Sequence, residues 1–332
     1  YNVAVGINAL DAITTGDFNI AIGYAALTAN TTGSGNTASG WEALEANTTG
    51  QSNVAIGSLS LTANTTGSWN TAVGYGSLTA NTTGNSNTAS GIAALYANTT
   101  GNYNTASGYH ALYANTTGAR NIAVGHGALD APDTEDDNLA IGYNALGGSI
   151  AGGEYNVAIG NYVLDANTSG DYNVAVGYNA LTANTTGSYN TASGSNSLSS
   201  NTTGDANTTF GNYSLYANTT GNYNTASGHQ SLYYNTEGDW NTASGFYSLN
   251  KNTTGNSNMA SGSYSLRNNT TGTRNIAVGY GALDGPDTEN DNLAIGYDAL
   301  GGSVAGGEYN AAVGNYALDA LTSGDGNTGV GY

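Results

Sequence analysis

The chain contains no cysteine, only two prolines and only four basic residues among its 332. Without cysteine, neither a disulfide framework nor thiolate chemistry is available to it. The chain has 23 acidic residues against these four basic ones, which gives a net charge of −19. This charge excludes the basic surface that nucleic-acid binding requires. No apolar run approaches the roughly 20 residues of a membrane helix, so we expect no membrane insertion within this segment.

A tandem repeat accounts for most of the remaining sequence. An asparagine opens a new repeat every 17 residues, as at Asn2, Asn19 and Asn36, and two steps of 18 residues lead to Asn156 and Asn310. The consensus of the nineteen full repeats reads N-T-A-S-G-Y-x-A-L-x-A-N-T-T-G-x-x, and its places are numbered 1 to 17. Repeats of this length indicate an array in which each repeat buries the face of its neighbour.

A longer period of 154 residues lies on top of the short one. Nine repeats form one super-repeat, which covers residues 2–155, recurs over 156–309 and begins again over 310–332. We therefore expect residues 1–332 to form a single continuous solenoid array. Because the pattern is interrupted at both ends, we also expect the array to be a segment of a longer chain.

The composition of each place predicts the fold. The first five places alternate as a short strand does, and side chains two residues apart share a face. The alanine of place 3, the small residue of place 8 and the leucine of place 9 then fill a narrow interior, as Ala55, Ser60 and Leu61 do in one repeat. Glycines at places 5 and 15 mark corners, and asparagines at places 1 and 12 can stack as ladders. The sequence thus predicts an all-β, parallel β-solenoid (β-roll) of about nineteen 17-residue rungs with a thin core of alanine and leucine.

Two strings carry a family resemblance. N-V-A-I-G at 53–57 and N-I-A-V-G at 121–125, the latter followed shortly by Ala-Leu, resemble the head repeats of YadA-type trimeric autotransporter adhesins. The arrays of N-T-A-x-G and N-T-T-G are also similar to repeats of phage tail-fibre-like and bacterial surface proteins. The resemblance implies a left-handed parallel β-roll, often trimeric, on an extracellular fibre that sticks to surfaces. The 17-residue repeat is longer than the adhesin repeat, which leaves handedness and the trimer open.

Places 2 and 4 change together along the chain, from Val/Ile pairs in some repeats to Thr/Ser pairs in others. One interpretation is a periodic lateral contact with a neighbouring chain, since exposed apolar bands mark interfaces. The other is that this face points inward and tolerates threonine and serine.

Place 12 opens a formal N-glycosylation sequon in twelve repeats. Glycans would then stand in a row, whereas the alternative gives asparagine a turn role and no sugar. The paired threonines also suggest an ice-binding grid of hydroxyls and methyls. The sequon asparagines are Asn30, Asn47, Asn64, Asn81, Asn98, Asn115, Asn167, Asn184, Asn201, Asn218, Asn252 and Asn269.

Aromatic residues gather at places 6 and 17. A ring with a polar tip suits sugar stacking and interfaces, and the alternative is stacking from rung to rung that stabilises the coil. The candidate surface-binding aromatics are Tyr24, Trp41, Trp69, Tyr75, Tyr103, Tyr109, Tyr223 and Trp240.

An acidic, proline-containing stretch replaces the N-T-T-G corner once in each complete super-repeat. Carboxylates at this density can bind Ca²⁺, the only cofactor that the sequence suggests, and the alternative is a solvated loop stiffened by proline. The candidate ligands are Asp133, Glu135, Asp136 and Asp137 in the first stretch, and Asp287, Glu289 and Asp291 in the second.

These patterns favour a structural and adhesive segment of an extracellular fibre or surface filament. We expect self-association as a trimer or filament, contact with glycans or cell surfaces, and a location outside the cell or at its surface. An enzyme is not expected, because His110, His126 and His229 are scattered and no serine has fixed partners. The alternatives are a carbohydrate- or surface-binding module that uses the aromatic rows, and an ice-binding solenoid.

Overall fold

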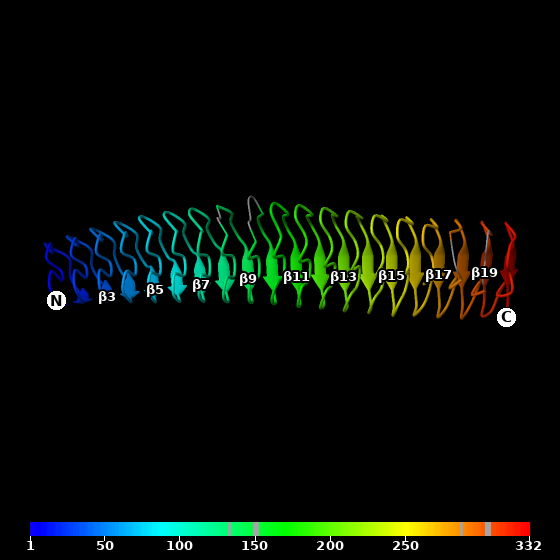
Figure 1. Cartoon of the computed structure of the whole chain (residues 1–332), viewed down its shortest axis with the longest axis horizontal. Helices are drawn as coiled ribbons and strands as arrows, with labels where there is room; N and C mark the ends of the chain where they lie inside the picture. Colours follow the sequence, from blue (N-terminus) through cyan, green and yellow to red (C-terminus); the bar gives the residue numbers. More distant parts are fainter. Residues whose placement is uncertain (132–133, 149–152, 286–287, 303–306) are drawn as a thin grey trace. The chain divides into compact units, whose positions relative to one another are not determined.

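The computed structural model describes residues 1–131, 134–148, 153–285, 288–302 and 307–332. The chain comprises two compact parts, the N-terminal half (Tyr1–Ser169) and the C-terminal half (Gly170–Tyr332). In both halves every rung carries one three-residue strand, at places 2 to 4 (Figure 1). The strands of the N-terminal half are β1 (Val3–Val5), β2 (Ile20–Ile22), β3 (Thr37–Ser39), β4 (Val54–Ile56), β5 (Thr71–Val73), β6 (Thr88–Ser90), β7 (Thr105–Ser107), β8 (Ile122–Val124), β9 (Leu139–Ile141) and β10 (Val157–Ile159). Those of the C-terminal half are β11 (Val174–Val176), β12 (Thr191–Ser193), β13 (Thr208–Phe210), β14 (Thr225–Ser227), β15 (Thr242–Ser244), β16 (Met259–Ser261), β17 (Ile276–Val278), β18 (Leu293–Ile295), β19 (Ala311–Val313) and β20 (Thr328–Val330).

Within each half, every strand pairs in parallel with the strand of the next rung. Equivalent places face each other, so that Ala38 pairs with Ala55 in β3 and β4. The 18-residue step between β9 and β10 keeps this register, with Leu139 opposite Val157, because the extra residue lies outside the strands. The predicted fold class is confirmed: the described residues form an all-β parallel solenoid of about nineteen turns, with no helix. Among them, accordingly, no helix is long and apolar enough to cross a membrane.

The interior is as thin as the sequence predicts. Ala55, Ser60 and Leu61 are fully buried, and the same three places are buried along the described rungs except at the ends of the array, as at Ala4, Ala9 and Leu318. Small side chains at places 3 and 8 let opposite walls of the coil approach, and the leucine of place 9 fills the space between them. Ser60 is satisfied inside this apolar surrounding because its hydroxyl donates to the carbonyl of Gly57 at 2.8 Å.

Two buried columns of asparagine form the polar part of the interior. At place 1, Asn36 Oδ1 accepts a hydrogen bond from the main-chain N–H of Asn53 at 3.0 Å. At place 12, the Nδ2 of Asn64 donates to Oδ1 of Asn47 at 2.8 Å. Both columns also donate to the place-15 carbonyl, so Gly67 O accepts from Asn53 Nδ2 at 2.8 Å and from Asn64 Nδ2 at 3.0 Å. The predicted asparagine ladders are therefore present, and a shared carbonyl joins them.

The corners depend on left-handed backbone. Gly57 at place 5 has φ of 130°, and a Cβ there would lie 2.5 Å from the carbonyl oxygen of Gly74 in the next rung. Glycine at this place is thus required by both backbone angle and space. The leucines of place 9 are also left-handed, as Leu61 shows with φ of 52°. A left-handed leucine costs about 1 kcal/mol, which burial of its side chain offsets.

Candidate functional site

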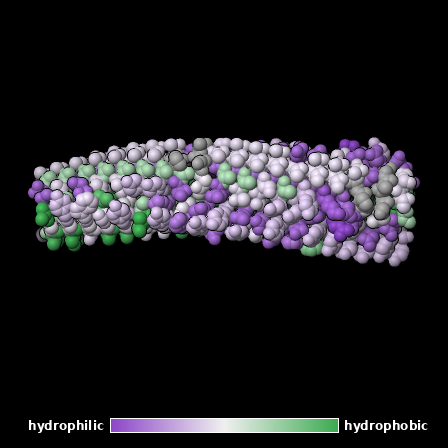
Figure 2. Space-filling model, in the orientation of Figure 1, coloured by the Kyte–Doolittle hydropathy of each residue, from purple (hydrophilic) through white to green (hydrophobic). Residues whose placement is uncertain are grey.

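The side chains at places 2 and 4 of the strands point outward and form a surface that we call the strand face. Ile20 and Ile22 are 40% and 45% exposed, while Ala21 between them is buried. The inward interpretation of this face is therefore wrong. In Figure 2 strongly apolar colouring gathers over the first strands of the N-terminal half. No side chain at places 2 and 4 of the twenty described strands is charged, although the chain as a whole carries −19.

Apolar and hydroxyl-bearing rungs alternate in bands along the strand face. Both outward side chains are apolar in β1, β2, β4 and β8 to β10 of the N-terminal half, and in β11 and β17 to β19 of the C-terminal half. Both are Thr or Ser in β3, β6, β7, β12, β14 and β15. Because the coil interior is the same under both kinds of rung, the bands are a property of the surface alone.

All twelve sequon asparagines are fully buried. In the rung of Asn64, both N–H groups of the side-chain amide are used, one in the ladder and one on Gly67. A glycan on Nδ2 would replace one of these donors, and the described coil has no room for a sugar beside it. The geometry thus supports the turn role for these asparagines. The threonine of place 13 is also engaged, since Thr65 Oγ1 donates to Thr82 O at 3.1 Å, which leaves one exposed file of threonines at place 14 in the described rungs.

The aromatics named by the sequence are exposed and form two columns, one on each side of the strand row. In several pairs of consecutive rungs the rings stack on each other. Tyr223 lies on Trp240 with ring centroids 4.1 Å apart and 11° between planes. Tyr109 lies on His126 at 5.0 Å. Parallel stacking covers the ring faces that a sugar would need and leaves edges in solvent, so these pairs support stacking along the coil. Tyr24, Trp41, Trp69, Tyr75 and Tyr103 are also exposed.

The three histidines belong to the same stacks. His110 lies on Tyr109 at 3.9 Å, and His229 lies on Phe246 at 5.6 Å. This surrounding supports a packing role for the imidazoles.

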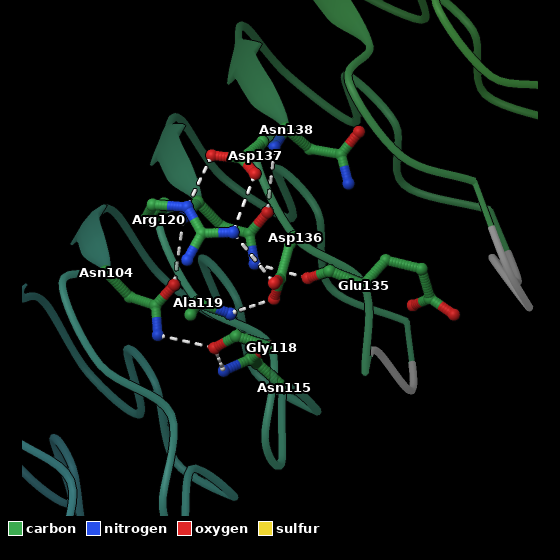
Figure 3. A network of polar contacts seen from close by, with 10 residues as sticks. Asn104, Asn115, Gly118, Ala119, Arg120, Glu135, Asp136, Asp137 and Asn138 are labelled. Atoms are coloured by element: carbon green, nitrogen blue, oxygen red, sulfur yellow. Dashed lines mark hydrogen bonds and ion pairs between the residues drawn. The ribbon is translucent and has the colours of Figure 1, made fainter.

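In the first acidic stretch, Asp136 and Asp137 surround Arg120 of the preceding rung (Figure 3). Arg120 Nε lies 2.7 Å from Asp137 Oδ1, and its Nη2 lies 2.8 Å from Asp136 Oδ2. The arginine holds the pKa of Asp137 below its usual range. Asp136 Oδ1 also accepts from the main-chain N–H of Ala119 at 2.7 Å. Arg274 and Asp291 repeat the pair at 2.7 Å, with the same lowering of the pKa of Asp291.

The remaining candidate calcium ligands either accept hydrogen bonds at the corner of the rung or lie outside the residues that the structure describes. Glu135 and Glu289 are buried and occupy place 15, where their main-chain carbonyls accept from the place-1 asparagines at 2.7 and 2.8 Å. Asp133 and Asp287 lie outside the described residues. Among the residues that are described, no three His, Asp or Glu side chains gather as metal ligands would. Of the candidate ligands, Asp136, Asp137 and Asp291 are ion-pair partners of arginine.

One groove that the sequence analysis missed lies over two adjacent rungs of the C-terminal half. Its volume is about 500 Å³. The rings of Phe246, Tyr247 and Tyr264 line it, together with two cations and two amides, Lys251, Arg267, Asn250 and Asn268. The sequence holds one signal for it: two of the chain's four basic residues stand 16 positions apart, each three or four positions after a tyrosine. We call this feature the Lys251 groove.

No protein-family model matches this sequence, and no curated protein shows significant similarity to it. The resemblance to adhesin and tail-fibre repeats therefore stays a prediction.

Proposed function

We propose that this chain is a structural and adhesive segment of an extracellular fibre, in which the number of rungs sets the length. The observation that supports the proposal is the identity of the bonds between rungs. Where neighbouring rungs both carry the N-T-T-G corner, each bonds to the next through its strand, both asparagine columns and the place-13 threonine, as between the rungs of β4 and β5. Stability then comes from rungs and their nearest neighbours, so rungs can be added or removed without a special site.

Deletion of whole rungs tests this function. Removal of residues 53–103 takes out three rungs and joins a place-17 residue to a place-1 residue. We expect the shortened chain to keep its circular dichroism spectrum and cooperative melting, and to lose ~14 Å of length in electron micrographs. Removal of 53–95 is the matched control, because it cuts a rung in half and places strand residues opposite corners. Loss of folding in the whole-rung deletion would contradict the proposal.

The strand face is the surface through which the fibre segment associates laterally with a second copy. Two molecules of charge −19 repel each other. The strand face has no charged side chain at places 2 and 4, so two copies meet the least repulsion when they approach through it. Its apolar bands lose water on contact, which favours association.

Paired charge substitutions test the lateral contact. Ile20→Lys with Ile22→Lys places two charges in an apolar band, and Thr88→Lys with Ser90→Lys places the same charges in a hydroxyl band. Sedimentation velocity is expected to show that the first pair shifts the parent assembly to smaller species by at least tenfold in dissociation constant, and that the second pair shifts it less. Equal effects, or a monomeric parent, would refute association through the apolar bands.

A further inference from the structure

The Lys251 groove is formed by the turn segments of two successive rungs, those of β15 and β16. Main-chain hydrogen bonds fix these segments to each other, from Lys251 N to Arg267 O at 2.9 Å and from Tyr264 N to Phe246 O at 2.9 Å. In Figure 2 the most hydrophilic colouring of the drawn face lies over the rungs of β15 to β17. The groove is therefore a fixed depression of the coil that presents charge and amides to solvent.

The two cations of the groove differ in what they contact. Arg267 lies over the ring of Tyr264, with its guanidinium carbon 5.2 Å from the centroid, and its Nε is 3.1 Å from Asp284 Oδ1. Lys251 is exposed and makes no ion pair with any residue that the structure describes. In a chain of charge −19, an unpaired ammonium beside a second cation is a local site for an anionic group.

The rings and amides of the groove add a second kind of recognition. Phe246 stacks on His229 of the preceding rung through one face, at 16° between planes, and it meets Tyr247 and Tyr264 at 60° and 81°. No parallel ring covers its other face, and the side chain is 42% exposed. Asn250 Nδ2 donates to Gln230 O at 2.8 Å, and Asn268 Nδ2 also donates to the next rung. The Oδ1 atoms of both amides have no hydrogen bond within the described part of the chain, and they can accept from hydroxyl groups.

The first super-repeat provides an internal comparison. The places that line the groove hold other residues 154 positions earlier, where Ala97 stands for Lys251 and Tyr113 for Arg267. The buried scaffold is unchanged, since leucine occupies place 9 and asparagine place 12 in both copies. The coil therefore does not require the two cations, and the groove is an addition to a surface that folds without it.

We propose that the Lys251 groove binds a carboxylated sugar at the end of a glycan, with Lys251 opposite the carboxylate, Phe246 against the sugar ring and the two amide oxygens on hydroxyls. A neutral sugar would desolvate the cations without compensation. A polyanion would be repelled by the rest of the chain, because the four basic residues are spread among 23 acidic ones. A sugar ring with a single carboxylate and several hydroxyl groups can contact the cations, the aromatic ring and the amide oxygens of the groove. The inference does not depend on the role of the coil as a fibre segment.

Titration of the full chain with 3′-sialyllactose, followed by saturation-transfer NMR and calorimetry, tests the site, with lactose as the neutral match. We expect 3′-sialyllactose to bind at least tenfold more tightly than lactose. Lys251→Ala is expected to weaken binding about tenfold, since a hydrogen bond to a charged group is lost, and Lys251→Arg to retain most of it. Arg120→Gln is the control, because it changes the net charge by the same amount at a residue that does not line the groove. Circular dichroism confirms that each variant is folded.

Three results would overturn the proposal. The first is absence of binding by 3′-sialyllactose to the folded parent chain. The second is equal weakening by Arg120→Gln and Lys251→Ala, which would assign the effect to net charge. The third is binding of polyglutamate without binding of the sugar, which would assign the groove to an acidic peptide such as a segment of a second copy. Rung deletions outside the C-terminal half leave this test unaffected, so its failure is separable from failure of the fibre function.

Discussion

Replacement of a buried sequon asparagine separates the turn role from the glycan role. In Asn64→Ala the amide that donates to Asn47 Oδ1 and Gly67 O, and accepts from Asn81 Nδ2, disappears. Gly67 O keeps its bond from Asn53, so two buried groups are orphaned, the Oδ1 of the preceding asparagine and one N–H of the following one. At 1 to 3 kcal/mol for each orphaned group, the expected loss of unfolding free energy is about 4 kcal/mol.

Thr66→Ala is the matched comparison. It destroys the same sequon but leaves Asn64 in place, and the threonine at this place is exposed. We expect it to change stability by no more than about 0.5 kcal/mol, as for an ordinary surface substitution. Urea unfolding followed by circular dichroism compares the two variants, and hydrogen exchange locates the loss in the neighbouring rungs.

Intact mass of the parent chain, produced in a host that glycosylates secreted proteins, completes the test. The ladder explanation requires folded parent protein without sugar on Asn64. If Thr66→Ala destabilised the chain as much as Asn64→Ala, or if folded parent protein carried a glycan there, the reasoning from buried amides would be refuted.

Four further substitutions probe the corner, the core and one partly buried carboxylate. Gly57→Ala, whose Cβ would lie 2.5 Å from the backbone of the next rung, should cost about 3 kcal/mol or more. Gly76→Ala, with 3.5 Å to the nearest atom, meets no clash and should cost only about 1 kcal/mol, from its left-handed φ of 64°. Thermal melting compares the two variants, and equal midpoints would contradict the steric argument. Leu61→Ala should cost about 3 kcal/mol by urea unfolding, because a fully buried leucine leaves a cavity; a loss below 1 kcal/mol would show that the thin core collapses around it. Burial raises the pKa of Asp284 to about 6 from 3.8, so the folded chain holds a proton that the unfolded chain releases between these values. The stabilisation by the protonated Asp284 carboxyl is complete below pH 4 and is lost as pH rises through 6, by about 1 kcal/mol after solvent screening. Asp284→Asn should therefore flatten the dependence of unfolding free energy on pH between 4 and 7. An unchanged slope would contradict the raised pKa of Asp284.

Local sequence pattern was sufficient for the fold because the same constraint acts in every rung. Alternation over five places, an invariant leucine and glycines at two corners leave few ways to bury a face except by stacking. The interior at Ala55, Ser60 and Leu61 followed from side-chain size alone. The ladders followed from identical residues recurring at the rung spacing, which brings amides into hydrogen-bonding range.

The outward direction of the side chains at places 2 and 4 was left open by the sequence and required the tertiary structure. Alternation says that places 2 and 4 share a face, and a period of two is the same whether that face points in or out. Closure of the coil decided it, because alanine at place 3 is the side chain that fits between the walls. The left-handed leucines were also invisible in the sequence, since leucine alone does not favour φ of 52° and adopts it at place 9 because burial offsets the strain.

For the candidate sites too, the sequence and the tertiary structure decided different properties. The sequence by itself determined which residues repeat, and so the rung, the core places and the ladders. The tertiary structure decided which repeated residues are accessible: it buried the Asn64 amide that the sequon pattern offered as a modification site, and it placed Lys251 beside Arg267 and Phe246 in one groove. The physical reason is that a repeat fixes contacts between identical places one rung apart, whereas a surface site joins different places of neighbouring rungs, and only the path of the folded chain brings these together.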